Sequence, residues 1–111
     1  MATVLEADRF LERPTALGTL LSGATGTTNG SWFEVHGARP LNVTVEGTFS
    51  ATCEARGSCS TTKPADTVHG VLLGSALTSA DSVIIDAPYM WVKVRITAYT
   101  SGSIDAFVFG G

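Results

Sequence analysis

Apolar and polar residues alternate strictly in two stretches of this sequence, and the alternation determines the class of fold that we expect. In residues 41–46, Leu41, Val43 and Val45 alternate with three polar residues. Residues 89–99 alternate over a longer stretch. Because successive side chains of a β-strand point to opposite faces, both stretches predict strands. The sequence therefore indicates a β protein.

The remaining strands are shorter and are bounded by residues that favour turns. Glycine, proline and serine separate these segments, and residues 54–66 are predicted to form a long loop. No helical pattern alternates with the strands, which argues against a parallel α/β sheet. We therefore predict an all-β antiparallel β-sandwich or jelly roll of about seven short strands. The additional candidate strands are residues 31–36, 49–53, 67–73, 82–86 and 104–109.

Residues 89–99 and 104–109 flank a short turn and are predicted to form an antiparallel hairpin. By strand parity, Tyr89, Trp91 and Tyr99 share one face with Lys93 and Arg95. This aromatic face has three interpretations: internal packing, a protein interface or a platform for stacking sugars. The two basic side chains favour a face that is at least partly in contact with water.

The first 28 residues differ from the rest of the chain. Residues 1–28 are predicted to form an N-terminal extended or short-helical arm with a linker, and residues 29–111 the sandwich domain. A short helix is expected over residues 5–12, because Pro14 cannot continue a helix. The arm is rich in large apolar residues, so it either wraps its own domain or reaches onto a neighbouring subunit.

The charge pattern excludes several classes of partner. Seven Lys and Arg residues stand against ten Asp and Glu, a formal net charge of −3, and the basic residues are scattered. Because phosphate binding depends on clustered basic residues, we expect no nucleic acid partner. No stretch is long and apolar enough for a membrane span, and the N-terminus has no signal-peptide pattern. We therefore expect synthesis in a cytoplasm and no membrane partner.

The residues that could carry chemistry form no recognisable constellation. His36 and His69 both lie beside glycines and outside any nucleophile motif, so we expect no enzyme and no catalytic residues. Neither glycine-rich phosphate loops nor metal-ligand spacings occur, so we expect no cofactor and no metal. Cys53 and Cys59 either form a disulfide across a turn or remain two free thiols; the second alternative is favoured.

Four segments of the chain resemble small virion proteins of tailed bacteriophages. They read GSW at 30–32, LNVTVEGTF at 41–49, APYMWVKV at 87–94 and ITAYTSGSI at 96–104. The chain departs from that pattern in residues 54–63, where the family has an alternating strand, and in its longer, more apolar arm. The motifs are structural rather than catalytic.

The resemblance implies a virion structural protein of the head decoration (cement) type, with a neck or tail component as the alternative. Its partners would be the major capsid protein or other virion proteins, and it would form a homo-oligomer. A carbohydrate-binding module that stacks sugars on Trp32, Trp91 and Tyr99 is the alternative from a different class. The interface residues that we predict are Leu5, Phe10, Leu11, Leu17, Leu20, Leu21, Tyr89, Trp91, Tyr99 and Phe107.

Overall fold

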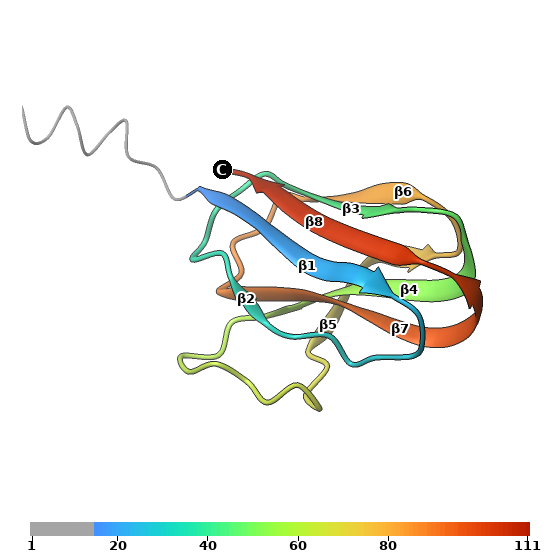
Figure 1. Ribbon diagram of the computed structural model, residues 1–111. Coiled ribbons are helices and arrows are strands. Elements are labelled where there is room, and N and C mark those ends of the chain that lie inside the picture. Colours follow the sequence, from blue (N-terminus) through green and yellow to red (C-terminus); the bar gives the residue numbers. More distant parts are fainter. Residues whose placement is uncertain (1–14) are drawn as a thin grey trace, which may run out of the picture.

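A computed structural model describes residues 15–111, which form an all-β protein with two antiparallel sheets (Figure 1). Sheet A has the strand order β1-β8-β3-β6, and sheet B has the order β2-β7-β4-β5. The predicted helix over residues 5–12 lies outside the described residues, as do Leu5, Phe10 and Leu11. The eight strands are β1 (Ala16–Ala24), β2 (Phe33–Glu34), β3 (Leu41–Glu46), β4 (Phe49–Ser58), β5 (Val71–Leu77), β6 (Asp81–Ile85), β7 (Trp91–Gly102) and β8 (Ile104–Gly110).

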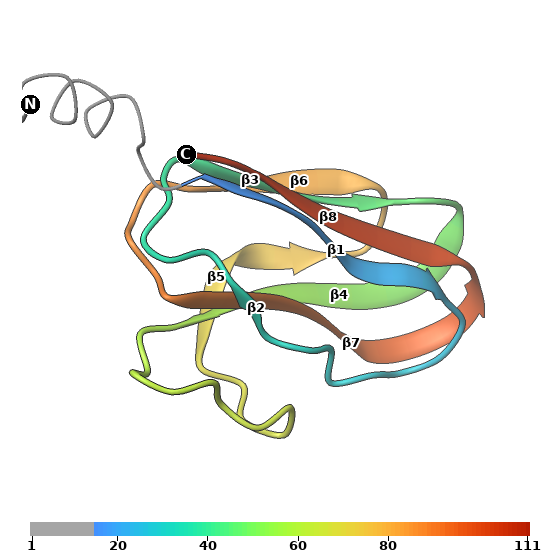
Figure 2. The ribbon, with the colours of Figure 1, turned by 60° about the vertical axis from the view of Figure 1, so that its left-hand side comes forward.

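The two sheets face each other and enclose one hydrophobic core, the arrangement of a β-sandwich. The layers are separate in two views of the ribbon (Figures 1 and 2). Val43 of β3 and Val94 of β7 are both fully buried, as the alternation predicts. Burying one such side chain contributes roughly 1.5–3 kcal/mol. Residues 15–111 contain no helix with the length and apolarity needed to cross a bilayer.

Two glycine corners carry the chain from one sheet to the other at the same end of the sandwich. Gly47 leads from β3 to β4, and Gly102 ends β7 just before β8, with φ angles of 115° and 100°. A Cβ at Gly102 would overlap the carbonyl oxygen of Thr48. The predicted hairpin is therefore wrong, because β7 pairs with β2 and β4 while β8 pairs with β1 and β3.

Strand β1 lies within the segment that we predicted as an arm. It pairs with β8, so the sandwich begins at Ala16 and not at residue 29. The pairing register shifts between Thr19 and Leu21, and Leu20 and Leu21 are both buried. The shift interrupts the alternation, which explains why the sequence pattern does not reveal this strand.

Strand β4 also extends further than predicted. It continues to Ser58, through the first part of the expected loop, and β5 begins at Val71. The inward-facing residues at the end of β4 are Ala55 and Gly57, both buried. Such small residues produce little hydrophobic alternation, so the pattern resembles a loop. The loop between β4 and β5 is residues 59–70.

Candidate interaction surfaces

The outer face of sheet A presents large apolar side chains to solvent. Strand pairing aligns Leu17, Phe109, Asn42 and Ile84 across β1, β8, β3 and β6 in that order. Leu17 is 77% exposed, Phe109 67% and Ile84 64%. We call these four residues the apolar row. It crosses the whole width of the sheet with only Asn42 as a polar member.

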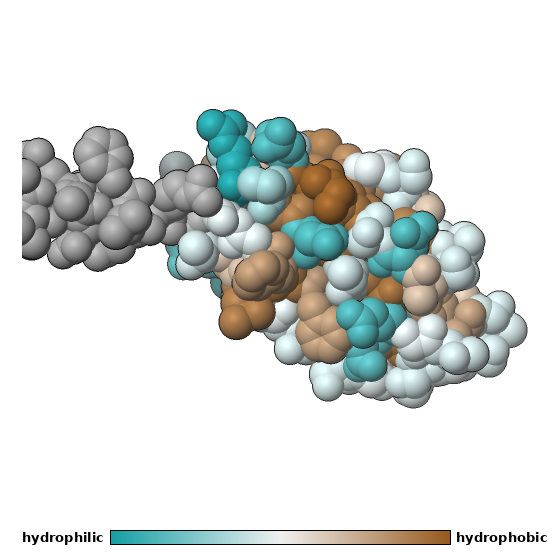
Figure 3. All heavy atoms as spheres, turned by 90° about the horizontal axis from the view of Figure 1, so that it is seen from above, coloured by the Kyte–Doolittle hydropathy of each residue, from teal (hydrophilic) through white to brown (hydrophobic). Residues whose placement is uncertain are grey.

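A shallow hollow lies within the apolar row. Its volume is about 320 Å³, and its lining includes Asn42, Ile84 and Phe109. Gly110 and Gly111, which have no side chains, also line the hollow. Figure 3 looks onto sheet A from above and shows apolar residues gathered beside polar ones on this face. Such a face has the shape and chemistry to receive an apolar side chain of a partner.

The alternation in β8 produces this surface. Ala106 and Val108 point into the core and are fully buried, so Phe107 and Phe109 point to the outer face. Phe107 pairs with Thr19 and Thr44 and is partly buried. Antiparallel sheets with one free face normally carry polar residues there. A central strand with aromatic residues on that face is therefore typical of a surface that another protein covers.

Part of the outer face of sheet B, in contrast, is covered by the chain's own loop, whereas Leu72 of β5 stays 40% exposed on that face. Lys93 of β7 has no exposed surface, although its parity places it on this outer face. Its Nζ donates hydrogen bonds to the carbonyl oxygens of Asp66 at 2.7 Å and Val68 at 2.8 Å. Nζ also lies 3.3 Å from Nδ1 of His69 and 4.8 Å from the centre of the Trp32 ring. The expectation that Lys93 marks a wet surface is therefore wrong.

Two indoles hold the same loop. Nε1 of Trp32 donates to the carbonyl oxygens of Ala65 and Val68, at 3.1 and 3.2 Å. Nε1 of Trp91 donates to the carbonyl oxygen of Ser60 at 3.0 Å. Desolvation lowers the pKa of Lys93, and the nearby Arg95 lowers it further. These contacts explain how residues 59–70 are fixed without a strand or helix of their own.

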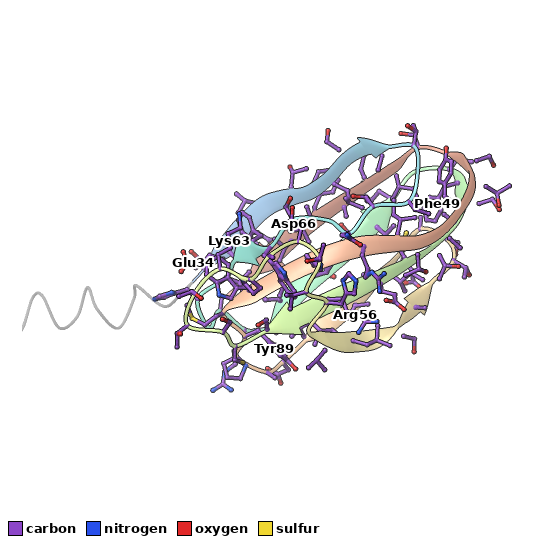
Figure 4. All side chains as sticks on the ribbon, turned by 90° about the horizontal axis from the view of Figure 1, so that it is seen from below. Glu34, Phe49, Arg56, Lys63, Asp66 and Tyr89 are labelled. Atoms are coloured by element: carbon purple, nitrogen blue, oxygen red, sulfur yellow. The ribbon has the colours of Figure 1, made fainter. Side chains whose placement is uncertain are left out.

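A charged cluster lies next to the buried lysine. Arg56 pairs with Glu54 at 2.6 Å, and Arg95 approaches the same carboxylate at 3.5 Å. Figure 4 shows Arg56 on sheet B and the loop with Asp66 crossing this face. Desolvation lowers the pKa of His69. The positive charges of Arg95, Lys93 and Arg56 lower this pKa further, whereas the negative charge of Glu54 raises it. Because these charges pair with one another within the domain, we interpret the cluster as stabilising the fold and not as a binding site.

The predicted aromatic face does not form. In β7, the pairing passes from Ile96–Cys53 to Ala98–Thr52, which leaves Thr97 as an additional residue, a β-bulge. The bulge reverses the alternation, so Tyr99 packs against the core, and its hydroxyl donates to the carbonyl oxygen of Gly102 at 2.6 Å.

Tyr89, Trp91 and the sugar-stacking candidate Trp32 are also engaged within the domain. The Tyr89 ring packs beside Gly57 at the core. Trp32 is only 3% exposed, and Trp91 holds the loop. The structure therefore does not bring Trp32, Trp91 and Tyr99 together as an exposed sugar platform.

The structure distributes the predicted interface residues over several places. Leu17 and Phe107 lie on the outer face of sheet A, whereas Leu20 and Leu21 lie in the core. Sequence reasoning misses Ile84 and Phe109 as interface candidates. Phe109 has the same strand parity as Phe107, so parity could have identified it as an interface candidate. Ile84 and Ile85 are consecutive in β6, so the sequence does not show which of the two points outward.

The two cysteines and the acidic residues form no additional centre in the described part of the chain. Cys53 is buried in β4, and burial raises the pKa of its thiol. Cys59 is exposed beyond the end of β4, and both thiols are free. Among residues 15–111, no three His, Cys, Asp or Glu side chains are grouped so that they could hold a metal ion.

Comparisons with known proteins give one likeness, and it is structural. No protein-family model matches the chain, and no curated protein matches it in sequence. The fold is similar to the crystal structure of the SPBc2 prophage-derived protein YomS, with a TM-score of 0.66 and 20% sequence identity. The match covers 87% of this chain and 93% of YomS. At this identity, the likeness establishes the fold.

Proposed function

We propose that this chain is a bacteriophage virion structural protein, and specifically a head decoration protein that stabilises the capsid through protein–protein contacts. Its partners are the major capsid protein or other virion proteins, together with further copies of itself. It acts by binding and not by catalysis. The observation that carries the proposal is the apolar row, in which Leu17, Phe109 and Ile84 are each about two-thirds exposed or more.

The energetics of a lattice favour such a surface. Burying apolar area contributes roughly 25 cal/mol per Å² before the cost of association is subtracted. One row of three large side chains is too small for tight binding by an isolated domain. On a lattice, each contact raises the effective concentration for the next, so many weak contacts together hold the protein in place.

Two further observations support a virion role. YomS, which has a similar fold, is by its name a prophage-derived protein. The strand orders β1-β8-β3-β6 and β2-β7-β4-β5 fit an eight-stranded jelly roll, a fold used by viral capsid domains. Since lectins use this fold as well, the fold alone does not select a function. The exposed apolar row favours a protein partner over a sugar.

The number of copies per particle tests the proposal. Particles produced from the genome that encodes this chain would be purified, and the chain would be quantified by mass spectrometry against the major capsid protein. Hundreds of copies are expected for a head decoration protein, and they would also fit a tail tube protein. About a dozen copies, as in a single ring, would indicate a neck component instead. Absence of the chain from washed particles would overturn the virion role.

Matched variants test the surface itself. The double variant Ile84→Ser, Phe109→Ser is expected to lower the number of copies bound to particles at least tenfold. Val71→Ser is the control, because Val71 is 57% exposed but lies on β5 of the other sheet. Normal occupancy of the double variant would contradict the assignment of the apolar row as the binding surface.

A further inference from the structure

We propose that the protein partner that covers the apolar row also carries lysine or arginine side chains, which bind Glu46 and Asp105. The inference rests on the proposed function for the role of the row, and it deepens that function by naming the chemistry of the partner surface. That surface presents an apolar side chain to the row and, about 13 Å away, a basic patch to the two carboxylates. The position of the two carboxylates, their like charge and their lack of cationic neighbours support it.

Glu46 and Asp105 lie at one end of the outer face that holds the apolar row. Strands β3 and β8 are adjacent in both ribbon views (Figures 1 and 2), and Glu46 pairs directly with Asp105. Four residues along the same two strands, Asn42 of the row pairs with Phe109. Alternate residues of both strands are buried, so the row and the two carboxylates face the same side. One partner surface can therefore contact both.

The two carboxylates repel each other in the isolated domain. Directly opposite residues on one face have Cβ atoms about 5 Å apart, and like charges at such positions are destabilising. Oδ1 of Asp105 accepts a hydrogen bond from the backbone N–H of Gly23 at 2.7 Å, and Oε2 of Glu46 accepts one from Thr44 at 3.2 Å. Among residues 15–111, no lysine, arginine or histidine pairs with either carboxylate. A cation from a partner would relieve the repulsion and add charge-assisted hydrogen bonds.

The charge of the whole sheet favours the same kind of partner. The four strands of sheet A contain three acidic residues, Glu46, Asp81 and Asp105, and no lysine or arginine. The field over this sheet therefore attracts a basic surface and repels an acidic one. The apolar row supplies the contact area, and the acidic end selects the partner and its orientation.

Charge also disfavours this chain as the cover of its own row. Residues 1–14 contain three acidic and two basic side chains. The whole chain has a formal net charge of −3, so a second copy would bring further negative charge to the acidic end. A different protein with a basic patch beside an apolar side chain complements this face better than either.

Binding kinetics on particles test the inference. Particles from a genome that lacks the coding sequence of this chain would be immobilised on a biosensor, and the purified full chain would be added. Charges at the rim of an interface act mainly on the association rate, so Glu46→Gln with Asp105→Asn should lower that rate about tenfold and change the dissociation rate less than about twofold. Raising NaCl from about 50 to about 500 mM should weaken binding of the wild type about tenfold and of this variant much less.

Controls separate the charge effect from folding and from the apolar contact. Glu34→Gln with Asp66→Asn removes the same charge from exposed positions outside sheet A, and this variant should associate like the wild type. Asparagine at position 105 still accepts the hydrogen bond from Gly23, so the acidic-pair variant should unfold at no lower temperature than the wild type. Ile84→Ser with Phe109→Ser should instead raise the dissociation rate and retain the dependence on salt.

Three results would overturn the inference. The first two are an acidic-pair variant that associates as fast as the wild type, and one that depends on salt as strongly. The third is protection of Ile84→Cys, combined with Cys59→Ser, from a maleimide in the free full chain, because the chain would then cover its own row. Failure of the wild type to bind particles would overturn the proposed function as well, whereas tight binding that ignores salt and the two carboxylates would contradict this inference alone.

Discussion

Replacing Lys93 by methionine tests whether the loop of residues 59–70 is held by a buried ammonium group. Lys93 has no exposed surface, and its Nζ donates to the carbonyl oxygens of Asp66 and Val68. Methionine retains most of the apolar stem and removes the charge. Val68 keeps a donor, because Nε1 of Trp32 also binds its carbonyl oxygen. Asp66 loses the hydrogen bond from Nζ.

The expected loss is the difference between two opposing contributions. Hydrogen bonds from a charged donor contribute roughly 1.5–3 kcal/mol each. The contact with the Trp32 ring contributes about 0.5–2 kcal/mol. Removing the ammonium from the interior also removes its desolvation penalty, which is several kcal/mol before compensation. We expect Lys93→Met to lower the free energy of unfolding by about 2 kcal/mol, because the loop loses two of its anchors.

Urea unfolding gives the free energy, and hydrogen exchange of the loop amides gives the local effect. Lys63→Met is the matched control, since Lys63 is exposed in the same loop, and its effect should stay within about 0.5 kcal/mol. Faster exchange in residues 59–70 should accompany the loss in the Lys93 variant only. If both variants were equally stable and exchanged alike, the account of the loop would be refuted.

The lowered pKa of Lys93 adds a dependence on pH. Because desolvation and Arg95 disfavour the charged form, the unfolded chain binds this proton more tightly than the folded chain. Between the lowered pKa and the ordinary value of 10.5, the wild type should therefore gain stability with rising pH relative to Lys93→Met. An unchanged difference across this range would contradict the assignment.

Three other predictions concern single residues. Gly102→Ala should cost about 3 kcal/mol in urea unfolding, because φ is 100° and the added Cβ overlaps the other corner. Ile84→Ser should change stability by less than about 0.5 kcal/mol, since the side chain is 64% exposed. Desolvation, Arg95 and Lys93 lower the pKa of His69, so the unfolded chain binds this proton more tightly than the folded chain. The wild type should therefore lose stability as the pH falls below 6.5, and His69→Gln should reduce this dependence on pH.

The fold could be predicted from the sequence wherever burial follows a regular period. Residues 41–46 have one buried face without interruption, so their alternation identifies β3 directly. Strand β1 could not be identified, because the shift after Thr19 places two consecutive leucines in the core. The sequence around Gly102 is also typical of a hairpin turn. The structure shows a corner between the sheets instead, because β8 pairs with β1 and β3 and not with β7.

The candidate surface was predictable only in part for a related reason. Parity places Phe107 and Phe109 on the same face of their strand, but it cannot tell which outer face a loop will cover. Lys93 shows this limit, since residues 59–70 bury it through contacts that are distant in sequence. The apolar row depends on the register of four strands, which no single stretch of sequence encodes.

The most direct test is the reactivity of a cysteine placed in the apolar row. Ile84→Cys would be combined with Cys59→Ser, which removes the exposed native thiol while Cys53 remains buried. Purified particles and the free domain of residues 15–111 would then be treated with a maleimide. The proposed function predicts rapid labelling of the free domain and strong protection in particles. Equal labelling rates in both would contradict the claim that another protein covers sheet A in the virion.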